Sequence, residues 1–200
     1  SVLGLISIAE KTQDPEEVRH CLTMMKERIH HLEEFIREII DYSRNSRVEV
    51  KRTPTNLYQL INDVVENLRH AQGSENIFVK YDIPKELDLK TDGSRLKVVL
   101  NNLIGNSIKY SDQEKENQFI SVKTSQEQDQ VKILIEDNGV GISQEHHLKI
   151  FDMFYRASEK SQGSGLGLYI VRETVQKLGG DISFESMPGK GTTFEIVIPS

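Results

Sequence analysis

A heptad pattern of apolar residues near the start of the chain most constrains its fold. Seven apolar residues follow one another at steps of four and three without a break, and charged residues flank them. This spacing predicts one long amphipathic helix. The neighbouring chain is too short to cover its stripe. A helical hairpin that pairs with a second copy in a dimeric four-helix bundle is therefore favoured over a helix packed on its own domain. The stripe comprises Val18, Leu22, Met25, Ile29, Leu32, Ile36 and Ile39.

The first arm of this hairpin precedes the stripe. Apolar residues run through the first nine positions, and a helix start follows, with Asp14 as the N-cap and Pro15 at the first helical position. Because the apolar pattern is already under way at Ser1 and no initiator Met is present, we expect the sequence to be cut from a longer protein. Residues 43–55 are polar and contain a proline, which predicts a linker.

The composition is that of a folded protein in a reducing compartment. Its 200 residues are 36% hydrophobic, and the single cysteine, Cys21, excludes a disulfide-rich module and a cysteine-based zinc site. A formal charge of -6 argues against nucleic acid as a partner. No apolar run approaches the ~18 residues of a membrane span. We therefore expect a cytoplasmic localisation, which leaves open a membrane anchor in the parent protein.

The heptad pattern does not continue into residues 53–200, where alternating strands and shorter helices are expected. We therefore predict two units, with residues 1–52 as a dimerization hairpin and its linker and residues 53–200 as the second domain. Polar residues between two alternating stretches predict a β-hairpin around 125–130. The pattern predicts an α/β sandwich with a mixed, mainly antiparallel sheet and helices on one face, and hence an α+β chain. Helices are expected after a Thr55 cap and over 94–110 and 166–178, and strands over 77–83, 119–124, 131–136, 181–185 and 193–198.

An asparagine-rich helix face is the first feature that packing does not explain. In the helix predicted over 94–110, Asn102, Asn106 and Lys109 fall at i, i+4 and i+7, away from the apolar face. Amide oxygens suit a hard cation such as Mg²⁺, and a nearby lysine suits the phosphates that the cation bridges. A plain polar helix face is the alternative, although two asparagines one turn apart lower helix propensity.

Two glycine-containing loops are the other candidates. Asp137–Ile142 directly follows a strand, and a buried carboxylate there suits an exocyclic amine of the kind that adenine carries. Gly163–Leu168 opens an apolar helix, where unhindered backbone amides and the helix dipole favour an anion. Each loop alone also occurs as an ordinary turn, and the chain has neither the Rossmann spacing nor a P-loop.

The order of these motifs resembles the N, G1, F, G2 and G3 boxes of the sensor histidine kinase catalytic core. The two boxes not yet mentioned correspond to Phe151–Arg156 and Gly189–Phe194, and the resemblance covers about Asn56 to Ser200. It extends to the wider superfamily of gyrase, heat-shock chaperone, histidine kinase and mismatch-repair ATPases. It implies ATP and Mg²⁺ as cofactors, γ-phosphate transfer to a histidine, and relay to a response-regulator receiver domain in a two-component system. The hairpin is similar to the family's dimerization region, which implies a homodimer and an upstream sensor domain.

The resemblance also implies roles for single residues. Asn106 is expected to ligate magnesium and, with Lys109, to be catalytic, while Asn102 and Lys109 contact phosphate. Asp137 is expected to read the adenine amine, with the glycines after it against the base, and Thr192 to support the base through Asp137 and water. The predicted nucleotide-binding residues are Asn102, Asn106, Lys109, Tyr110, Asp137, Gly139, Gly141, Ile142, Gly163, Gly165, Leu166, Gly167 and Thr192.

Further implications concern the reaction. Residues 143–162 are expected to form a mobile lid over the phosphates. Where a hydrolase of this superfamily has a general-base carboxylate, this chain has Asn102, which favours transfer to a protein side chain over hydrolysis. None of the six histidines stands in the family's acceptor setting, so the acceptor is expected just before Ser1. A dimerising, nucleotide-binding pseudokinase scaffold is the alternative, and a serine kinase of the anti-sigma-factor kind ranks below it.

Overall fold

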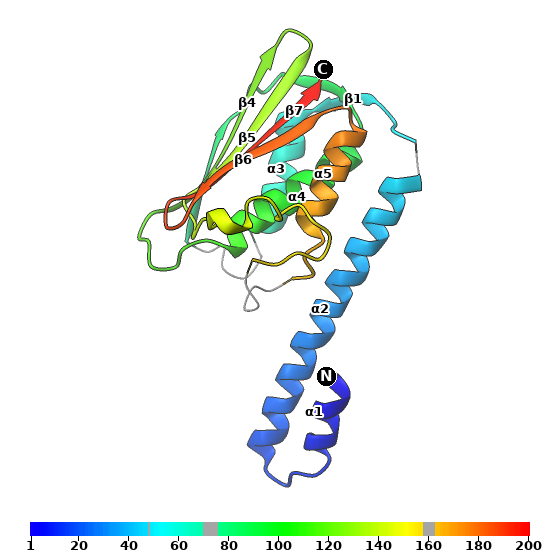
Figure 1. Cartoon of the computed structure of the whole chain (residues 1–200), viewed down its shortest axis with the longest axis vertical. Helices are drawn as coiled ribbons and strands as arrows, with labels where there is room; N and C mark the ends of the chain where they lie inside the picture. Colours follow the sequence, from blue (N-terminus) through cyan, green and yellow to red (C-terminus); the bar gives the residue numbers. More distant parts are fainter. Residues whose placement is uncertain (48, 70–75, 158–162) are drawn as a thin grey trace.

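The chain begins with a helical hairpin that projects from an α/β unit (Figure 1). The hairpin consists of α1 (Val2–Ala9) and α2 (Pro15–Arg47). As predicted, Pro15 is the first residue of α2, and Asp14 Oδ1 accepts a hydrogen bond of 3.0 Å from the backbone N–H of Glu16. The computed structural model describes residues 1–47, 49–69, 76–157 and 163–200.

The second helix of the hairpin is longer than predicted. It continues to Arg47, so the linker that we expected from Ser43 starts later, and Thr53–Asn56 forms a strand. The prediction was wrong here because a polar composition alone does not end a helix. Arg52 fastens the shorter linker to the α/β unit by donating a hydrogen bond of 3.1 Å to the carbonyl oxygen of Leu178.

The heptad stripe of α2 is exposed in the single chain. Leu22 and Leu32 each keep 57% of their surface exposed, and Ile29, Ile36 and Ile39 are also exposed. The helical hairpin is therefore present with a long apolar face open to solvent, which is the kind of surface that marks an interaction site. Within the described residues, no helix combines the length and apolar character needed to span a bilayer.

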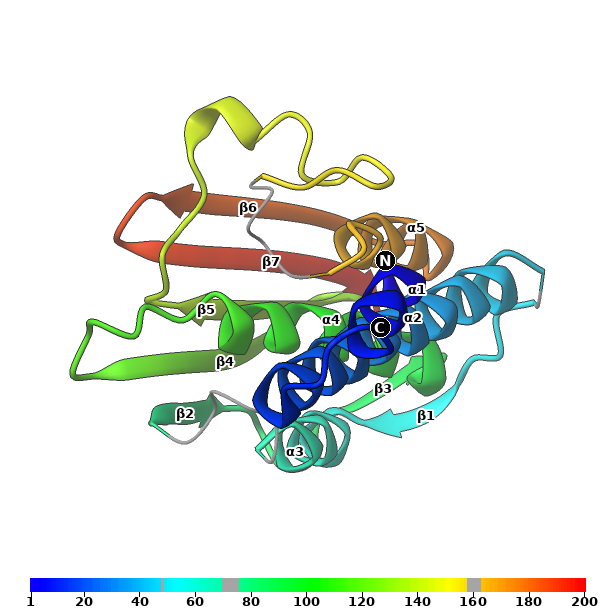
Figure 2. The ribbon, with the colours of Figure 1, turned by 90° about the horizontal axis from the view of Figure 1, so that it is seen from below.

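A five-stranded sheet with the order β2-β4-β5-β7-β6 forms the body of the second unit (Figure 2). β2 runs parallel to β4 and the other neighbouring strands are antiparallel, so the predicted mixed, mainly antiparallel sheet is confirmed. The predicted hairpin is β4–β5, with a tighter turn than expected, because Glu127 already pairs with Gln130. The strands are β2 (Ile77–Asp82), β4 (Gln118–Glu127), β5 (Gln130–Asp137), β6 (Asp181–Met187) and β7 (Gly191–Pro199).

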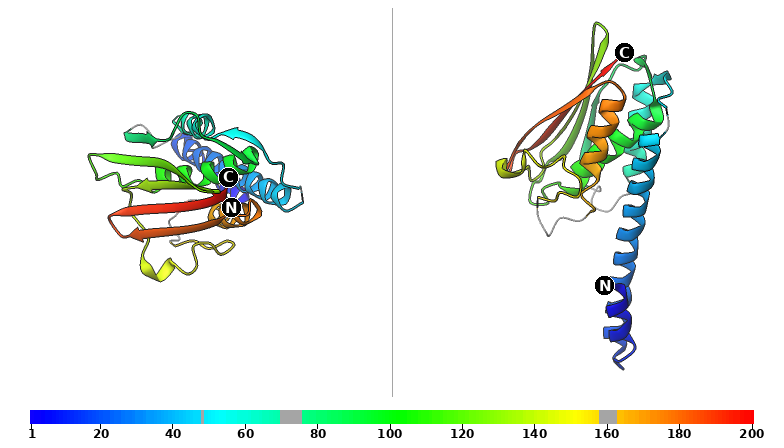
Figure 3. Two further views of the ribbon diagram at one scale, coloured as in Figure 1. Left: turned by 90° about the horizontal axis from the view of Figure 1, so that it is seen from above. Right: turned by 45° about the vertical axis from the view of Figure 1, so that its right-hand side comes forward.

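Three helices cover one face of this sheet (Figure 3), as predicted. Alternate residues of β5, namely Val131, Ile133 and Ile135, are buried beneath the helices. On the outer face, Lys132 forms an ion pair of 3.2 Å with Glu195 of β7. The helices are α3 (Leu57–Leu68), α4 (Gly93–Lys109) and α5 (Gly167–Lys177).

A second, two-stranded sheet was missed by the sequence pattern. It pairs β1 (Thr53–Asn56) with β3 (Asp88–Thr91), and strands of four residues are too short for alternation to stand out. The cap of α3 also differs from the prediction. The helix begins at Leu57, and the side chain of Asn56, the last residue of β1, accepts the backbone N–H of Gln59 at 2.9 Å, so Asn56 caps the helix in place of Thr55.

Candidate functional site

A cavity of about 440 Å³ opens between α4, the loop after β5, the start of α5 and the turn between β6 and β7. It brings together residues from all three motifs that the sequence pattern singled out, although these motifs are far apart in the chain. The predicted nucleotide-binding residues that line it are Asn102, Asn106, Lys109, Tyr110, Asp137, Gly141, Ile142, Gly163, Gly165, Gly167 and Thr192.

Helix α4 supplies the amide face of the cavity. The Asp92 side chain caps its first turn by accepting the backbone N–H of Arg95 at 3.2 Å. Asn102 Nδ2 donates to the carbonyl oxygen of Val98 (2.9 Å), while Asn102 Oδ1 faces the start of α5. A Cβ on Gly167 would lie 2.7 Å from that oxygen, so a larger residue there would displace the Asn102 side chain where the two helices meet.

Three donors fix the carboxylate of Asp137 at the end of β5. Its Oδ1 accepts the backbone N–H groups of Gly139 (2.9 Å) and Thr192 (3.1 Å), and its Oδ2 accepts the hydroxyl of Ser107 (3.0 Å). Burial raises the pKa of Asp137 above its ordinary value, and these hydrogen bonds and the charge of Lys115 counter only part of that effect. A fixed, poorly hydrated acceptor of this kind favours a hydrogen-bond donor on a ligand.

The loop after Asp137 packs so closely on its neighbours that glycines are required. A Cβ on Gly139 would lie 2.3 Å from the carbonyl oxygen of Tyr110, and a Cβ on Gly141 would lie 2.1 Å from that of Met187. Gly141 also has a φ of +70°, which favours glycine. Gly139 is not among the residues that line the cavity, and it packs on the Tyr110 backbone, while its expected contact with a base stays a prediction.

The glycine segment before α5 borders the cavity next to α4. Gly163 has a φ of +114°, and a Cβ on it would lie 2.7 Å from Lys109 Nζ. Leu166 is the second predicted residue outside the cavity lining, because it is a buried N-cap residue of α5 whose backbone N–H donates to Ser164 Oγ at 3.0 Å. The positive end of the α5 dipole therefore lies at the cavity, where it favours an anion.

Two residues that hold this site were missed by the sequence pattern. Ser107 fixes Asp137, and the only sequence signal for it is a hydroxyl among the apolar positions of α4. The Ser186 hydroxyl lies 2.8 Å from the Thr192 hydroxyl and accepts the backbone N–H of Ile142 at 2.8 Å. Their roles depend on contacts between distant segments, which local patterns do not reveal.

The expected lid is described only in part, since residues 158–162 lie outside the described residues. In its described part, His146 Nδ1 and Tyr155 Oη are 2.8 Å apart, and both side chains line the cavity. His147 Nε2 lies 3.1 Å from the carbonyl oxygen of Ile142. Both histidines therefore have partners within the fold.

The side chains in the cavity suit a magnesium ion that binds together with phosphates. Asn106 offers an amide oxygen, which is a suitable ligand for Mg²⁺. Among the described residues, no group of three or more His, Cys, Asp or Glu side chains could hold a metal ion. A cation beside Asn106 would therefore complete its coordination with water and phosphate oxygens, and Lys109 would add positive charge for the same phosphates.

Residues 91–200, more than half of the chain, match the family described as histidine kinase-, DNA gyrase B-, and HSP90-like ATPase. The chain belongs to this family.

Relatives within this family include several histidine kinases. The signal transduction histidine-protein kinase BarA of Escherichia coli is 28% identical over 204 residues, which cover 96% of this chain and 22% of BarA. The sensor histidine kinase WalK of Bacillus subtilis is 36% identical over 126 residues, which cover 61% of this chain and 20% of WalK. The structure of histidine kinase ThkA in complex with response regulator protein TrrA has a TM-score of 0.77 and 27% identity, and the match covers 99% of this chain and 56% of that chain.

These similarities confirm the recognition of an ATP-binding histidine kinase catalytic domain. The chain spans about a fifth of the length of BarA and of WalK.

Proposed function

We propose that this chain is the core of a sensor histidine kinase, which transfers the γ-phosphate of ATP to a histidine for relay to a response-regulator aspartate. The observation that carries the proposal is the partly buried Asp137 carboxylate, held by Ser107 and Thr192 at a cavity that it shares with the asparagine face of α4. A carboxylate held in this way suits the adenine amine, and the start of α5 suits the phosphates.

The other residues of the cavity have roles that follow from their chemistry. Magnesium, when bound with ATP beside Asn106, would neutralise phosphate charge. Lys109 would stabilise the negative charge on the γ-phosphate that is transferred and on the ADP that leaves. Asn102 cannot accept a proton from water, because its side chain is an amide. This supports phosphate transfer to a protein side chain over hydrolysis of ATP.

The proposal includes partners and a location. We propose a homodimer through the hairpin, a receiver domain as the phosphate acceptor in the relay, an upstream sensor domain in the parent protein, and a cytoplasmic location for the chain itself. The exposed stripe of α2 supports the homodimer. The rings of Tyr42 on α2 and Tyr169 on α5 have centroids 5.7 Å apart. This contact supports the proposal that a signal from the sensor domain passes from the hairpin to the start of α5.

A phosphorylation assay tests the proposed reaction. With Mg²⁺ and γ-labelled ATP, we expect acid-labile, base-stable phosphate on a longer version of the protein that includes the segment before Ser1. We expect none on the 200-residue chain, because none of its histidines has the expected acceptor setting. ATP binding without labelling of the longer protein would instead support the pseudokinase scaffold, and acid-stable phosphate would indicate a serine kinase. Histidine phosphate on the 200-residue chain would contradict the placement of the acceptor.

The homodimer has a separate test. Replacing both Leu22 and Leu32 with glutamate puts charges on the stripe where two hairpins would pack, so we expect the dimer to dissociate in sedimentation equilibrium. Leu148→Glu is the matched control, because this leucine is 94% exposed and lies outside the hairpin. A chain that is monomeric without any substitution, or a double variant that stays dimeric, would contradict this interface.

A further inference from the structure

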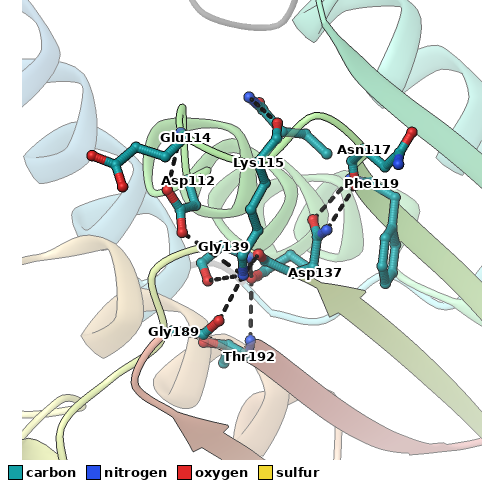
Figure 4. A network of polar contacts seen from close by, with 11 residues as sticks. Asp112, Glu114, Lys115, Asn117, Phe119, Asp137, Gly139, Gly189 and Thr192 are labelled. Carbon is teal, nitrogen blue, oxygen red and sulfur yellow. Dashed lines mark hydrogen bonds and ion pairs between the residues drawn. The ribbon is translucent and has the colours of Figure 1, made fainter.

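The side chain of Lys115 ends among backbone carbonyl groups of two loops beside the cavity (Figure 4). Its Nζ donates to the carbonyl oxygens of Asn138 (2.6 Å) and Gly189 (2.7 Å), and it lies 3.4 Å from that of Gly139. Asp112 Oδ2 lies 3.8 Å from the same nitrogen, and the lysine side chain is only 29% exposed. An ammonium group has three hydrogens to donate, and these partners account for all of them.

The segment that carries this lysine also holds the loop after β5 by other contacts. Asn138 Oδ1 accepts the backbone N–H of Phe119 (2.9 Å), and Asn138 Nδ2 donates to the carbonyl oxygen of Asn117 (2.8 Å). The β6–β7 turn reaches the same loop through the backbone N–H of Gly189, which donates to the carbonyl oxygen of Val140 at 2.8 Å. The lysine therefore joins three segments at one point.

Each of the two loops that the lysine joins contains or directly precedes a donor to the carboxylate of Asp137. Gly139 donates from the loop after β5, and Thr192 donates from the start of β7, three residues after the Gly189 carbonyl that the lysine binds. The spacing between the loops therefore decides where the free lone pairs of the carboxylate point. Lys115 is absent from the residues that line the cavity in the described structure, so it acts on the site from outside.

We infer that Lys115 is a positioning residue for base recognition, which sets the Asp137 carboxylate for the adenine amine by clamping the loop after β5 to the β6–β7 turn. The positive charge of Lys115, like its hydrogen bonds, supports Asp137 as a hydrogen-bond acceptor. Burial raises the pKa of Asp137, and the nearby Lys115 ammonium opposes that shift and so favours the ionised acceptor. The inference rests on the proposed function, because it requires Asp137 to bind the adenine amine.

The test compares the affinities for ATP and inosine triphosphate, which carries a carbonyl oxygen in place of the amine. Isothermal titration calorimetry with Mg²⁺ gives both affinities for the 200-residue chain and its variants. Lys115→Met keeps an unbranched side chain that is one atom shorter and removes its charge and donors, and we expect ATP affinity to fall about fivefold to tenfold. Affinity for inosine triphosphate should change much less, so the ratio of the two affinities falls. Lys115→Arg, which retains donors and charge, should restore at least half of the lost ATP affinity.

Lys132→Met is the matched control, because its ammonium also pairs with one carboxylate at similar exposure, but on the outer face of the sheet. It should leave the ratio unchanged. If Lys115→Met lowers both affinities equally, or neither, the lysine has no positioning role and the inference is overturned. Asp137→Asn separates this outcome from failure of the proposed function. If Asp137→Asn reduces the ratio and Lys115→Met does not, only the inference fails, whereas a ratio unchanged by Asp137→Asn contradicts the proposed nucleotide site itself.

Discussion

Replacing Asp137 with asparagine is expected to weaken ATP binding about 100-fold, which corresponds to roughly 2.8 kcal/mol. The reason lies in the donors that surround the side chain. The backbone N–H groups of Gly139 and Thr192 both point at Oδ1, so the amide oxygen of the asparagine has to take that place. The amide nitrogen then takes the place of Oδ2, between Ser107 and the cavity. There it presents a donor to the donating adenine amine.

Titration calorimetry with Mg²⁺ and ATP measures this loss directly. Asp129→Asn is the matched control, because it makes the same chemical change at an exposed position in the turn between β4 and β5. The control should bind ATP like the unsubstituted chain. A loss of less than about threefold in Asp137→Asn would mean that this carboxylate does not bind the base.

The same prediction has a pH dependence with a defined sign. Burial raises the pKa of Asp137 in the free protein, and a donor from the ligand favours the ionised form, so binding lowers that pKa. ATP affinity should therefore reach its highest value at a pH above the pKa of Asp137 in the ATP-free protein. It should fall as the pH drops below that pKa, by up to about tenfold per pH unit. The Asp137→Asn variant lacks this group, so its remaining pH dependence reports the titration of ATP itself.

The fold was largely predictable because its longest elements have clear periods. The heptads of α2 and the alternation in β4 and β5 each extend over enough residues to identify the element. What local pattern could not give was the end of α2 and the pairing of β1 with β3. The helix continues through polar residues, and the short strands depend on partners that are distant in sequence.

The residues that meet at the cavity were predictable where an unusual residue stands in a local pattern, as with Asn106 in a helix or Asp137 before a glycine loop. The site was not predictable where a residue acts through the fold. Gly139 is a glycine because the Tyr110 backbone approaches it, and this contact joins segments almost thirty positions apart on the printed sequence. The support that Lys115 gives to two loops is invisible to periodicity for the same reason.

Replacing Gly141 with alanine is expected to damage both the fold and the site. A φ of +70° costs alanine about 1–2 kcal/mol. The added Cβ would also lie 2.1 Å from the carbonyl oxygen and 2.7 Å from the carbonyl carbon of Met187, and a backbone neighbour cannot rotate away as a side chain can. The loop and the end of β6 must therefore separate. We expect the free energy of unfolding to fall by about 3 kcal/mol or more in urea denaturation, with a loss of ATP affinity of at least about tenfold.

Gly189→Ala separates the backbone cost from the contact cost. Gly189 has nearly the same backbone angle, with a φ of +74°, yet no atom lies within 4 Å of the position that its Cβ would take. Its substitution should therefore cost only the conformational part, about 1 kcal/mol, and leave ATP affinity within about twofold. The difference between the two variants measures the close approach of the loop to β6. Equal losses of stability in both would mean that the loop can move away from Met187 at no cost, and the tight packing inferred for this side of the site would be wrong.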